Sequence, residues 1–133
     1  MSEQTTAVVK RLYEALDKAD IQTVLEIFDP EVEIVTPPSL PWSTGHYQGH
    51  AGAAQYFGGA LEHLEDTGFK VTEIRVAGDW AAAIGNWYGR FRAGGGEFDV
   101  RFVHFWELRD GRVVRTEGIS DTDGIVRAAS GAA

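Results

Sequence analysis

The stretch VRFVHFWELRDGRVV, residues 100–114, decides the fold. An apolar and aromatic run ends at an Asp-Gly dipeptide, which is typical of a tight hairpin turn, and a second β-rich run follows. Phe102, His104 and Trp106 alternate with residues that are equally apolar, so both faces of the first strand need to be covered. The pattern predicts a β-hairpin inside a sheet, with an ionisable histidine on one of its covered faces.

The segments on either side predict helices first and strands later. Apolar residues recur at helical spacing over 6–18, and Asp20 can cap a second helix. That helix should end at Asp29, because Pro30 disfavours helical backbone in the residue before it. The other expected elements are a strand at 31–36, a Pro-rich loop at 37–50, a helix at 51–65, strands at 69–77, 80–93, 96–108 and 112–120, and a last helical turn within 120–130. This order predicts one α+β domain over residues 1–133, with the helices on one face of the sheet and a cleft between the two layers.

Composition excludes several classes of function. The chain has 133 residues, a formal net charge of −8 and no cysteine, so we expect no disulfide and neither a nucleic-acid nor a membrane partner. The four histidines show no metal-ligand spacing, and no cofactor motif is present. We therefore expect neither metal nor cofactor. The N-terminal segment lacks the apolar core of a signal peptide, which predicts a cytoplasmic protein.

Three motifs carry a resemblance to a known family: FDPEVEI at 28–34, GHYQGHAGAAQYF at 45–57 and DGRVV at 110–114. In this order, the chain resembles the nuclear transport factor 2-like superfamily, and within it the SnoaL-like and ketosteroid-isomerase-related proteins. The resemblance covers nearly the whole chain. It implies a cone in which a curved antiparallel sheet wraps three helices (a cystatin-like α+β barrel), an apolar pocket inside, and a homodimer formed through the outer sheet face.

The resemblance implies two functions of different classes. The first is a cofactor-independent cyclase, isomerase or dehydratase that acts on a small hydrophobic oxygenated metabolite, such as a polyketide or terpenoid. The second is a non-catalytic binding or assembly module on the same fold. Small residues expected on the inner face of the last strand (Thr116, Gly118 and Ser120) favour room for a ligand.

The catalytic residues of the family do not carry over. The general-base aspartate of the ketosteroid isomerases matches Thr36, and their two oxyanion donors match Leu12 and Val103, although Tyr13 is adjacent to the first. The aspartate of SnoaL-like cyclases, counted from the hairpin glycine, matches Gly118. These residues cannot supply a base and an oxyanion donor, so the steroid-isomerase route is not expected.

The same matching predicts which side chains face the cone interior. With Val103 inward, Arg101, Phe105, Asn86 and Tyr88 also face inward, and the outer face of the sheet carries Trp87, Phe91, Phe102, His104 and Trp106. That apolar face favours a dimer interface that includes His104. A slip of one residue would reverse every assignment, and His104 would then become the natural general base.

Candidate site residues follow from these considerations. His46 is a titratable group in the loop expected at the pocket mouth. Arg101 could bind a ligand oxygen or pair with a nearby carboxylate, and the Tyr88 hydroxyl could serve a ligand or the backbone. Asp121 precedes the last helical turn and is expected to cap it. The catalytic candidates are His46, Tyr88, Arg101 and His104. The ligand-binding candidates are Tyr13, Thr36, Trp42, Tyr56, Asn86, Val103, Phe105, Thr116, Gly118 and Ser120.

Overall fold

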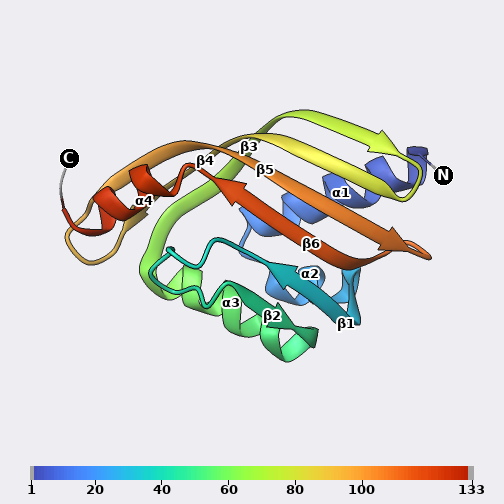
Figure 1. The fold of residues 1–133 in the computed structure, drawn as a ribbon, viewed down its shortest axis with the longest axis horizontal. Helices are drawn as coiled ribbons and strands as arrows, with labels where there is room; N and C mark the ends of the chain where they lie inside the picture. The colour runs from blue at the N-terminus through green and yellow to red at the C-terminus, as the bar shows by residue number, and fades with distance from the viewer. Residues whose placement is uncertain (1, 132–133) are drawn as a thin grey trace.

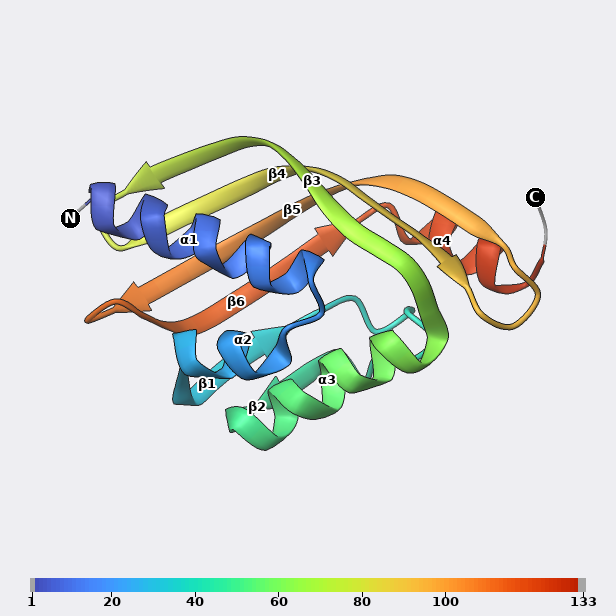
Figure 2. The ribbon, with the colours of Figure 1, turned by 180° about the vertical axis from the view of Figure 1, so that it is seen from behind.

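A computed structural model describes residues 2–131 as a curved sheet with helices packed on its inner face (Figure 1). The helices α1 and α2 lie behind the sheet in Figure 1 and in front of it in Figure 2. The elements are α1 (Ser2–Asp17), α2 (Ile21–Ile27), β1 (Phe28–Val35), β2 (His46–Gln48), α3 (Gly49–His63), β3 (Leu64–Ala77), β4 (Trp80–Phe91), β5 (Glu97–Arg109), β6 (Arg112–Ser120) and α4 (Thr122–Ala129). The predicted α+β class is confirmed.

The six strands run in the order β2-β1-β6-β5-β4-β3. Neighbouring strands are antiparallel except β1 and β6, which pair in parallel. The expectation of an antiparallel sheet is therefore wrong at this pair. The long connection that a parallel pair requires is supplied by α3 and the strands β3 to β5. The order begins at β2 and ends at β3, so the sheet is curved but does not close into a barrel.

Local signals place the helices close to where the sequence predicts them. The Asp20 carboxylate accepts a hydrogen bond from the backbone N–H of Thr23 and caps α2, and the apolar stripe of α2 buries Val24 and Ile27. At the other end of the chain, α4 is a full helix, with Ile125 and Ala128 buried. Asp121 occupies its N-cap position, but its side chain makes no capping hydrogen bond. The predicted capping role of Asp121 is therefore wrong.

A β-bulge in the β5–β6 hairpin decides which side chains face inward. Arg109 lies opposite Arg112 across the turn, but the register shifts by one residue after Leu108, which leaves Val114 without a partner on β5. In a hairpin without the bulge, Gly118 would lie opposite Val103. With the bulge, Gly118 lies opposite His104. The bulge therefore puts His104 on the inner face together with Gly118.

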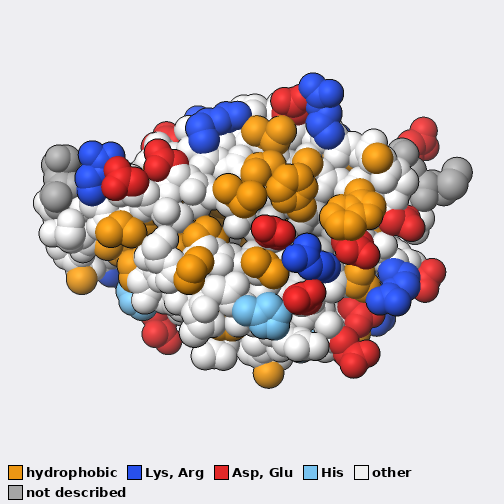
Figure 3. Space-filling model, in the orientation of Figure 1, with side chains coloured by type: hydrophobic (Ala, Val, Ile, Leu, Met, Phe, Trp, Pro, Cys, Tyr) orange, Lys and Arg blue, Asp and Glu red, His pale blue; other side chains and the backbone are white. Residues whose placement is uncertain are grey.

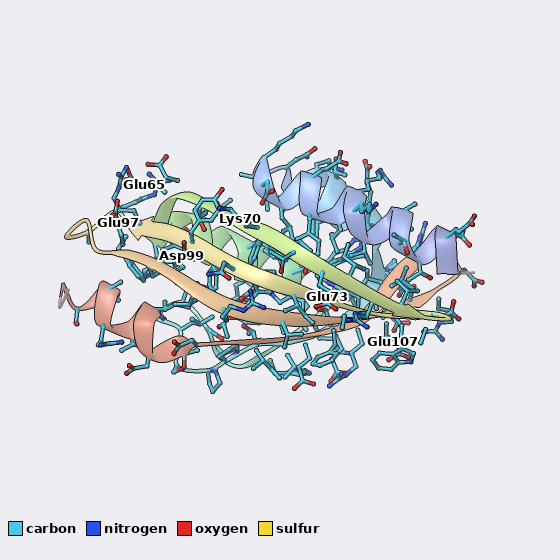
Figure 4. All side chains as sticks on the ribbon, turned by 90° about the horizontal axis from the view of Figure 1, so that it is seen from above. Glu65, Lys70, Glu73, Glu97, Asp99 and Glu107 are labelled. Carbon is cyan, nitrogen blue, oxygen red and sulfur yellow. The ribbon has the colours of Figure 1, made fainter. Side chains whose placement is uncertain are left out.

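The outer face of the sheet carries a row of apolar side chains across three strands. Ile84 pairs with Val103, and Val103 pairs with Ile119. Ile119 is 50% exposed and Phe105, two residues along from Val103, is 37% exposed. Figure 3 shows this apolar patch with charged side chains of both signs beside it. Among the labelled charged residues, Glu65, Lys70, Glu97 and Asp99 gather toward the end of the sheet near α4, and Glu73 and Glu107 lie toward the other end (Figure 4).

Candidate functional site

A small cavity of about 50 Å³ lies between the helices and the inner face of the sheet. Side chains from β1, α3, β3, β5 and β6 meet there, together with Leu16 near the end of α1. Most of the lining is apolar or aromatic, and the polar groups come from a few residues only. The lining residues are Leu16, Ile34, Val35, Thr36, Tyr56, Phe57, Phe69, His104, Trp106, Thr116 and Gly118.

His104 is the only imidazole among those lining residues, and two neighbours hold it in place. The Tyr13 hydroxyl lies 2.6 Å from His104 Nδ1, and the Trp106 indole N–H donates to the same hydroxyl over 3.1 Å. An indole nitrogen can only donate, and the structure gives the Tyr13 hydroxyl proton no other acceptor among the described residues, so we assign that proton to the hydrogen bond with His104 Nδ1. That arrangement makes Nδ1 an acceptor and places the ring proton on Nε2. No described residue hydrogen-bonds to Nε2, which lies at the cavity wall near Gly118.

Burial keeps both members of this pair neutral. The rings of Phe102, Phe69 and Trp106 surround the imidazole, with centroids 4.5, 5.1 and 5.6 Å from it. This apolar surrounding lowers the pKa of His104 to about 3. Burial raises the pKa of Tyr13 as well, although the hydrogen bond from Trp106 acts in the opposite direction. The imidazole is therefore uncharged at neutral pH, and its Nε2–H can donate to a ligand.

A second polar pair lies on the wall formed by β1 and α3. The hydroxyls of Thr36 and Tyr56 are 3.0 Å apart, and burial raises the pKa of Tyr56 even though the hydrogen bond with Thr36 acts to lower it. Thr116 contributes a further hydroxyl, for which the structure gives no hydrogen-bond partner among the described residues. All three hydroxyl-bearing side chains belong to the cavity lining.

Phe69 separates this cavity from two other hollows. A neighbouring cavity of about 60 Å³ shares Leu16, Tyr56, Phe57 and Phe69 with the first. On the outside, an open groove of about 610 Å³ between α1 and β3 is also lined by Phe69. Phe69 is the one side chain common to the linings of all three hollows. Its ring is therefore the partition between the groove and the interior.

Five predicted site residues lie on the opposite side of the sheet from the cavity. The predicted facing is wrong along β5 because it follows from matching Val103 to an inward carboxylate of the family, whereas the bulge at Val114 places His104, not Val103, opposite the inward-facing Gly118. The error extends to β4, which pairs with β5 without a register shift. Arg101 donates to Asn86, and Asn86 donates to Asp99, in an exposed chain of hydrogen bonds. The misplaced residues are Asn86, Tyr88, Arg101, Val103 and Phe105, which face outward.

Three other candidates do not line the cavity. His46 is exposed on β2, where its Nε2 lies 3.0 Å from a carboxylate oxygen of Glu33. Trp42 packs against Trp87 and Phe91, and its indole N–H has no hydrogen-bond partner among the described residues. Ser120 is on the inner face opposite Phe102 but lies beyond the cavity lining. By contrast, Thr36, Tyr56, His104, Thr116 and Gly118 do meet at the cavity.

Three aromatic residues outside the set of predicted site residues also shape the site. Trp106 was expected on the outer face but is buried inside, where it donates to Tyr13. Phe57 lies beside the predicted Tyr56 on α3, and Phe69 is close to the start of β3. The signal for Phe69 was its place as the first apolar residue in the alternating segment at 69–77. Tyr13, rather than its neighbour Leu12, is the α1 residue that reaches His104.

Comparison with solved structures identifies the class of fold. An NTF2-like protein of unknown function from Burkholderia pseudomallei has a TM-score of 0.88 at 23% identity, over 96% of this chain and 98% of that one. A Jannaschia protein provisionally named a SnoaL-like polyketide cyclase has a TM-score of 0.84 at 20% identity, over 97% and 93%. TerC, co-crystallised with polyporic acid, has a TM-score of 0.85 at 25% identity, over 96% and 98%. The fold is NTF2-like.

Within that class the family is defined by the sequence. The family model described as SnoaL-like domain matches residues 9–116, and the chain therefore belongs to the SnoaL-like family, as its motifs predicted. No curated protein matches the chain significantly. Over residues 2–131, no helix is both long and apolar enough to cross a bilayer. In the same part of the chain, no group of three or more His, Asp or Glu side chains is arranged to hold a metal ion.

Proposed function

We propose that this SnoaL-like protein is a cofactor-independent enzyme of the isomerase or cyclase type, and that it acts on a small hydrophobic oxygenated metabolite. The observation that carries the proposal is the orientation of His104. Hydrogen bonds from Trp106 to Tyr13 and from Tyr13 to Nδ1 leave Nε2–H directed to an apolar cavity. Because Nε2–H has no partner among the described residues and lies at the wall of an apolar cavity, a ligand oxygen is its natural partner.

In this proposal His104 acts as an electrophile. With a pKa of about 3 the imidazole is a weak base, but as a neutral group it can donate Nε2–H to a carbonyl oxygen. When the substrate rearranges or cyclises, negative charge builds up on that oxygen, and a fixed donor in an apolar cavity stabilises it. The cavity lining includes no carboxylate, so in this scheme a second oxygen of the substrate accepts the proton that leaves the substrate carbon and returns it to the rearranged skeleton.

The interior has to enlarge to hold such a substrate. Pockets for metabolites usually measure about 300–1,000 Å³, whereas the cavity beside His104 measures about 50 Å³. Displacement of Phe69 would join this cavity to its neighbour and to the groove between α1 and β3. We therefore assign the groove as the route of entry. TerC, which was co-crystallised with polyporic acid, supports an oxygenated organic substrate.

Untargeted mass spectrometry tests the proposal. Apolar extract from the source organism is incubated with the wild-type protein, with His104→Phe and with His46→Phe, without added cofactor. We expect a compound that is consumed while an isomer, or a product lacking one water, appears with the wild type and with His46→Phe but not with His104→Phe. His46→Phe is the matched control because His46 is exposed and remote from the cavity. Equal conversion by all three proteins would exclude His104 from the chemistry.

The second candidate function is a binding module without chemistry. It is favoured by the low pKa of His104, which makes the imidazole a poor proton acceptor. The same extract distinguishes the two. A binding module would retain a compound through gel filtration and release it with unchanged structure, and His104→Phe would reduce the retained amount.

We also propose a homodimer through the outer sheet face. The row of Ile84, Val103 and Ile119 crosses three strands, and Phe105 extends it. Charged side chains of both signs border the row, including Arg101 on one side and Glu117 on the other. A two-fold axis through the row would bring unlike charges of the two copies together. The partner in this proposal is a second copy of the chain.

A further inference from the structure

Three residues lie side by side across the inner face of the sheet. Gly118 forms the floor of the cavity, and His104 and Thr36 lie on its two sides. His104 on β5 pairs with Gly118 on β6. Val35 on β1 pairs with Glu117, so the next residue, Thr36, lies beside Gly118 on its other side. Gly118 has no side chain, and a Cβ placed there would lie 3.2 Å from His104 Cδ2. The glycine therefore leaves an open floor between a donor on one side and a hydroxyl on the other.

The Thr36 side of the floor has a spare hydrogen-bond donor. Thr36 and Tyr56 have two hydroxyl protons between them, and their mutual hydrogen bond uses one. The structure gives no other acceptor among the described residues for the second proton, whichever of the two oxygens carries it. Burial raises the pKa of Tyr56, so the phenol does not lose its proton at neutral pH.

Donors outnumber acceptors around the floor. His104 Nε2–H and the spare hydroxyl proton are both without a partner among the described residues, and the Thr116 hydroxyl lies on the same strand as Gly118. The lining side chains contain no carboxylate or amide, and only hydroxyl oxygens can accept. A group that brings its own proton into this cavity would leave that proton poorly satisfied, which carries a free-energy cost.

We infer that the ligand of this cavity is a dicarbonyl compound held at both ends. One oxygen accepts from His104 Nε2–H, the other accepts from the Thr36–Tyr56 pair, and the apolar skeleton lies over Gly118. The inference rests on the proposed function, in which His104 donates to a ligand oxygen, and it adds the second contact. It distinguishes a dicarbonyl from the corresponding diol, whose two hydroxyl protons would have few acceptors.

Three ring compounds of matched skeleton test the inference: 1,4-cyclohexanedione, cyclohexanone and 1,4-cyclohexanediol. Dissociation constants are measured by NMR titration of the wild-type protein with ¹⁵N-labelled histidine, which reports contact at His104. We expect the dione to bind about tenfold more tightly than cyclohexanone, as one additional hydrogen bond implies. The diol should bind no more tightly than cyclohexanone.

A double variant, Thr36→Val with Tyr56→Phe, removes the second contact. Each single change would leave one hydroxyl proton free, so only the double change is decisive. Both substitutions are close in shape, and removing both partners of a hydrogen bond is nearly neutral for stability. The dione should then lose its tenfold preference, while cyclohexanone should bind as before and still shift the His104 signals. Tyr88→Phe, which removes a hydroxyl from the outer face, is the matched control and should retain the preference.

The outcomes separate the inference from the proposed function. If the wild type binds cyclohexanone and the dione equally while the His104 signals shift, the two-ended contact is wrong and His104 remains a donor. If the diol binds as tightly as the dione, the dicarbonyl class is wrong. If none of the three compounds shifts the His104 signals at concentrations of about 10 mM, any dissociation constant is too high for a specific ligand. The inference and the donor role of His104 then both fail.

Discussion

The Tyr13 hydroxyl and His104 Nδ1 lie 2.6 Å apart, and this hydrogen bond determines which imidazole nitrogen faces the cavity. Tyr13 comes from α1 and His104 from β5, so the contact joins the helical layer to the sheet. Trp106, two residues from His104 on the same strand face, adds a donor to the same hydroxyl. The three side chains therefore couple the stability of the core to the protonation state of the candidate site.

Tyr13→Phe should destabilise the protein and release the ring orientation of His104. The change leaves the Trp106 N–H without an acceptor and His104 Nδ1 without a donor, and each buried unsatisfied group costs about 1–3 kcal/mol. We expect a loss of about 2–4 kcal/mol in the free energy of unfolding, measured by urea denaturation. Tyr88→Phe, at an exposed tyrosine, should change it by less than about 0.5 kcal/mol. Equal effects of the two substitutions would show that the network contributes nothing to stability.

Stability should fall in acid because of His104. Its pKa drops from 6.5 to about 3 on folding, so the unfolded chain takes up the proton first. The contribution is complete above pH 6.5 and is lost as the pH falls toward 3, at about 1.4 kcal/mol per pH unit. The wild type should therefore lose about 2 kcal/mol relative to His104→Phe between pH 7 and pH 5.

The comparison with His104→Phe isolates this effect, because the carboxylates with lowered pKa, such as Glu33 and Glu65, are present in both proteins. Urea denaturation at each pH gives the difference directly. Parallel pH profiles for the two proteins would mean that His104 titrates normally and is exposed to water.

Gly118→Ala should close the floor of the cavity while the fold persists. The backbone there needs no glycine conformation, but the new methyl group would lie 3.2 Å from an imidazole that Tyr13 holds in place. We expect the affinity for 1,4-cyclohexanedione to fall at least tenfold, measured by NMR titration, because the ligand and the methyl group compete for the same space. Gly58→Ala on α3, where an added Cβ meets nothing within 4 Å, is the control and should bind as the wild type does.

The overall arrangement of elements could be predicted from sequence because it depends on strong local signals: Asp20 at a helix start, Pro30 after a helix end and the Asp-Gly turn at 110–111. The facing of β5 could not, because a single unpaired residue, Val114, reverses it and has no distinctive sequence signature. Gly118 and Thr116 were placed correctly on the inner face because their positions were counted along β6 itself, from the hairpin glycine Gly111, and did not depend on the pairing with β5. The contact between Tyr13 and His104 joins residues 91 positions apart, and no local pattern specifies it.

Phe69→Ala should open the interior to the groove between α1 and β3. Phe69 packs against Trp87 and Phe102 with ring centroids 5.5 and 5.1 Å away, so its removal costs up to about 3–5 kcal/mol of stability. The same substitution should join the groove and the two cavities, because Phe69 lines all three. We expect faster uptake of an apolar fluorescent probe in stopped-flow experiments. Phe105→Ala on the outer face should leave the uptake rate unchanged.

Ile119→Glu should convert the proposed homodimer to a monomer. Ile119 is 50% exposed in the single chain and lies at the end of the apolar row on the outer face. In a dimer built on that row, a carboxylate at this position would lose its hydration without a partner. Sedimentation equilibrium at micromolar concentration should give about twice the chain mass of 14.6 kDa for the wild type and the single chain mass for the variant. Val126→Glu, at an exposed apolar residue on α4, is the control and should remain dimeric. A wild-type protein that sediments as a monomer would show that the outer face is not an interface. Because His104 lies on the inner face of the sheet, protonation of its imidazole should not change the mass of the assembly.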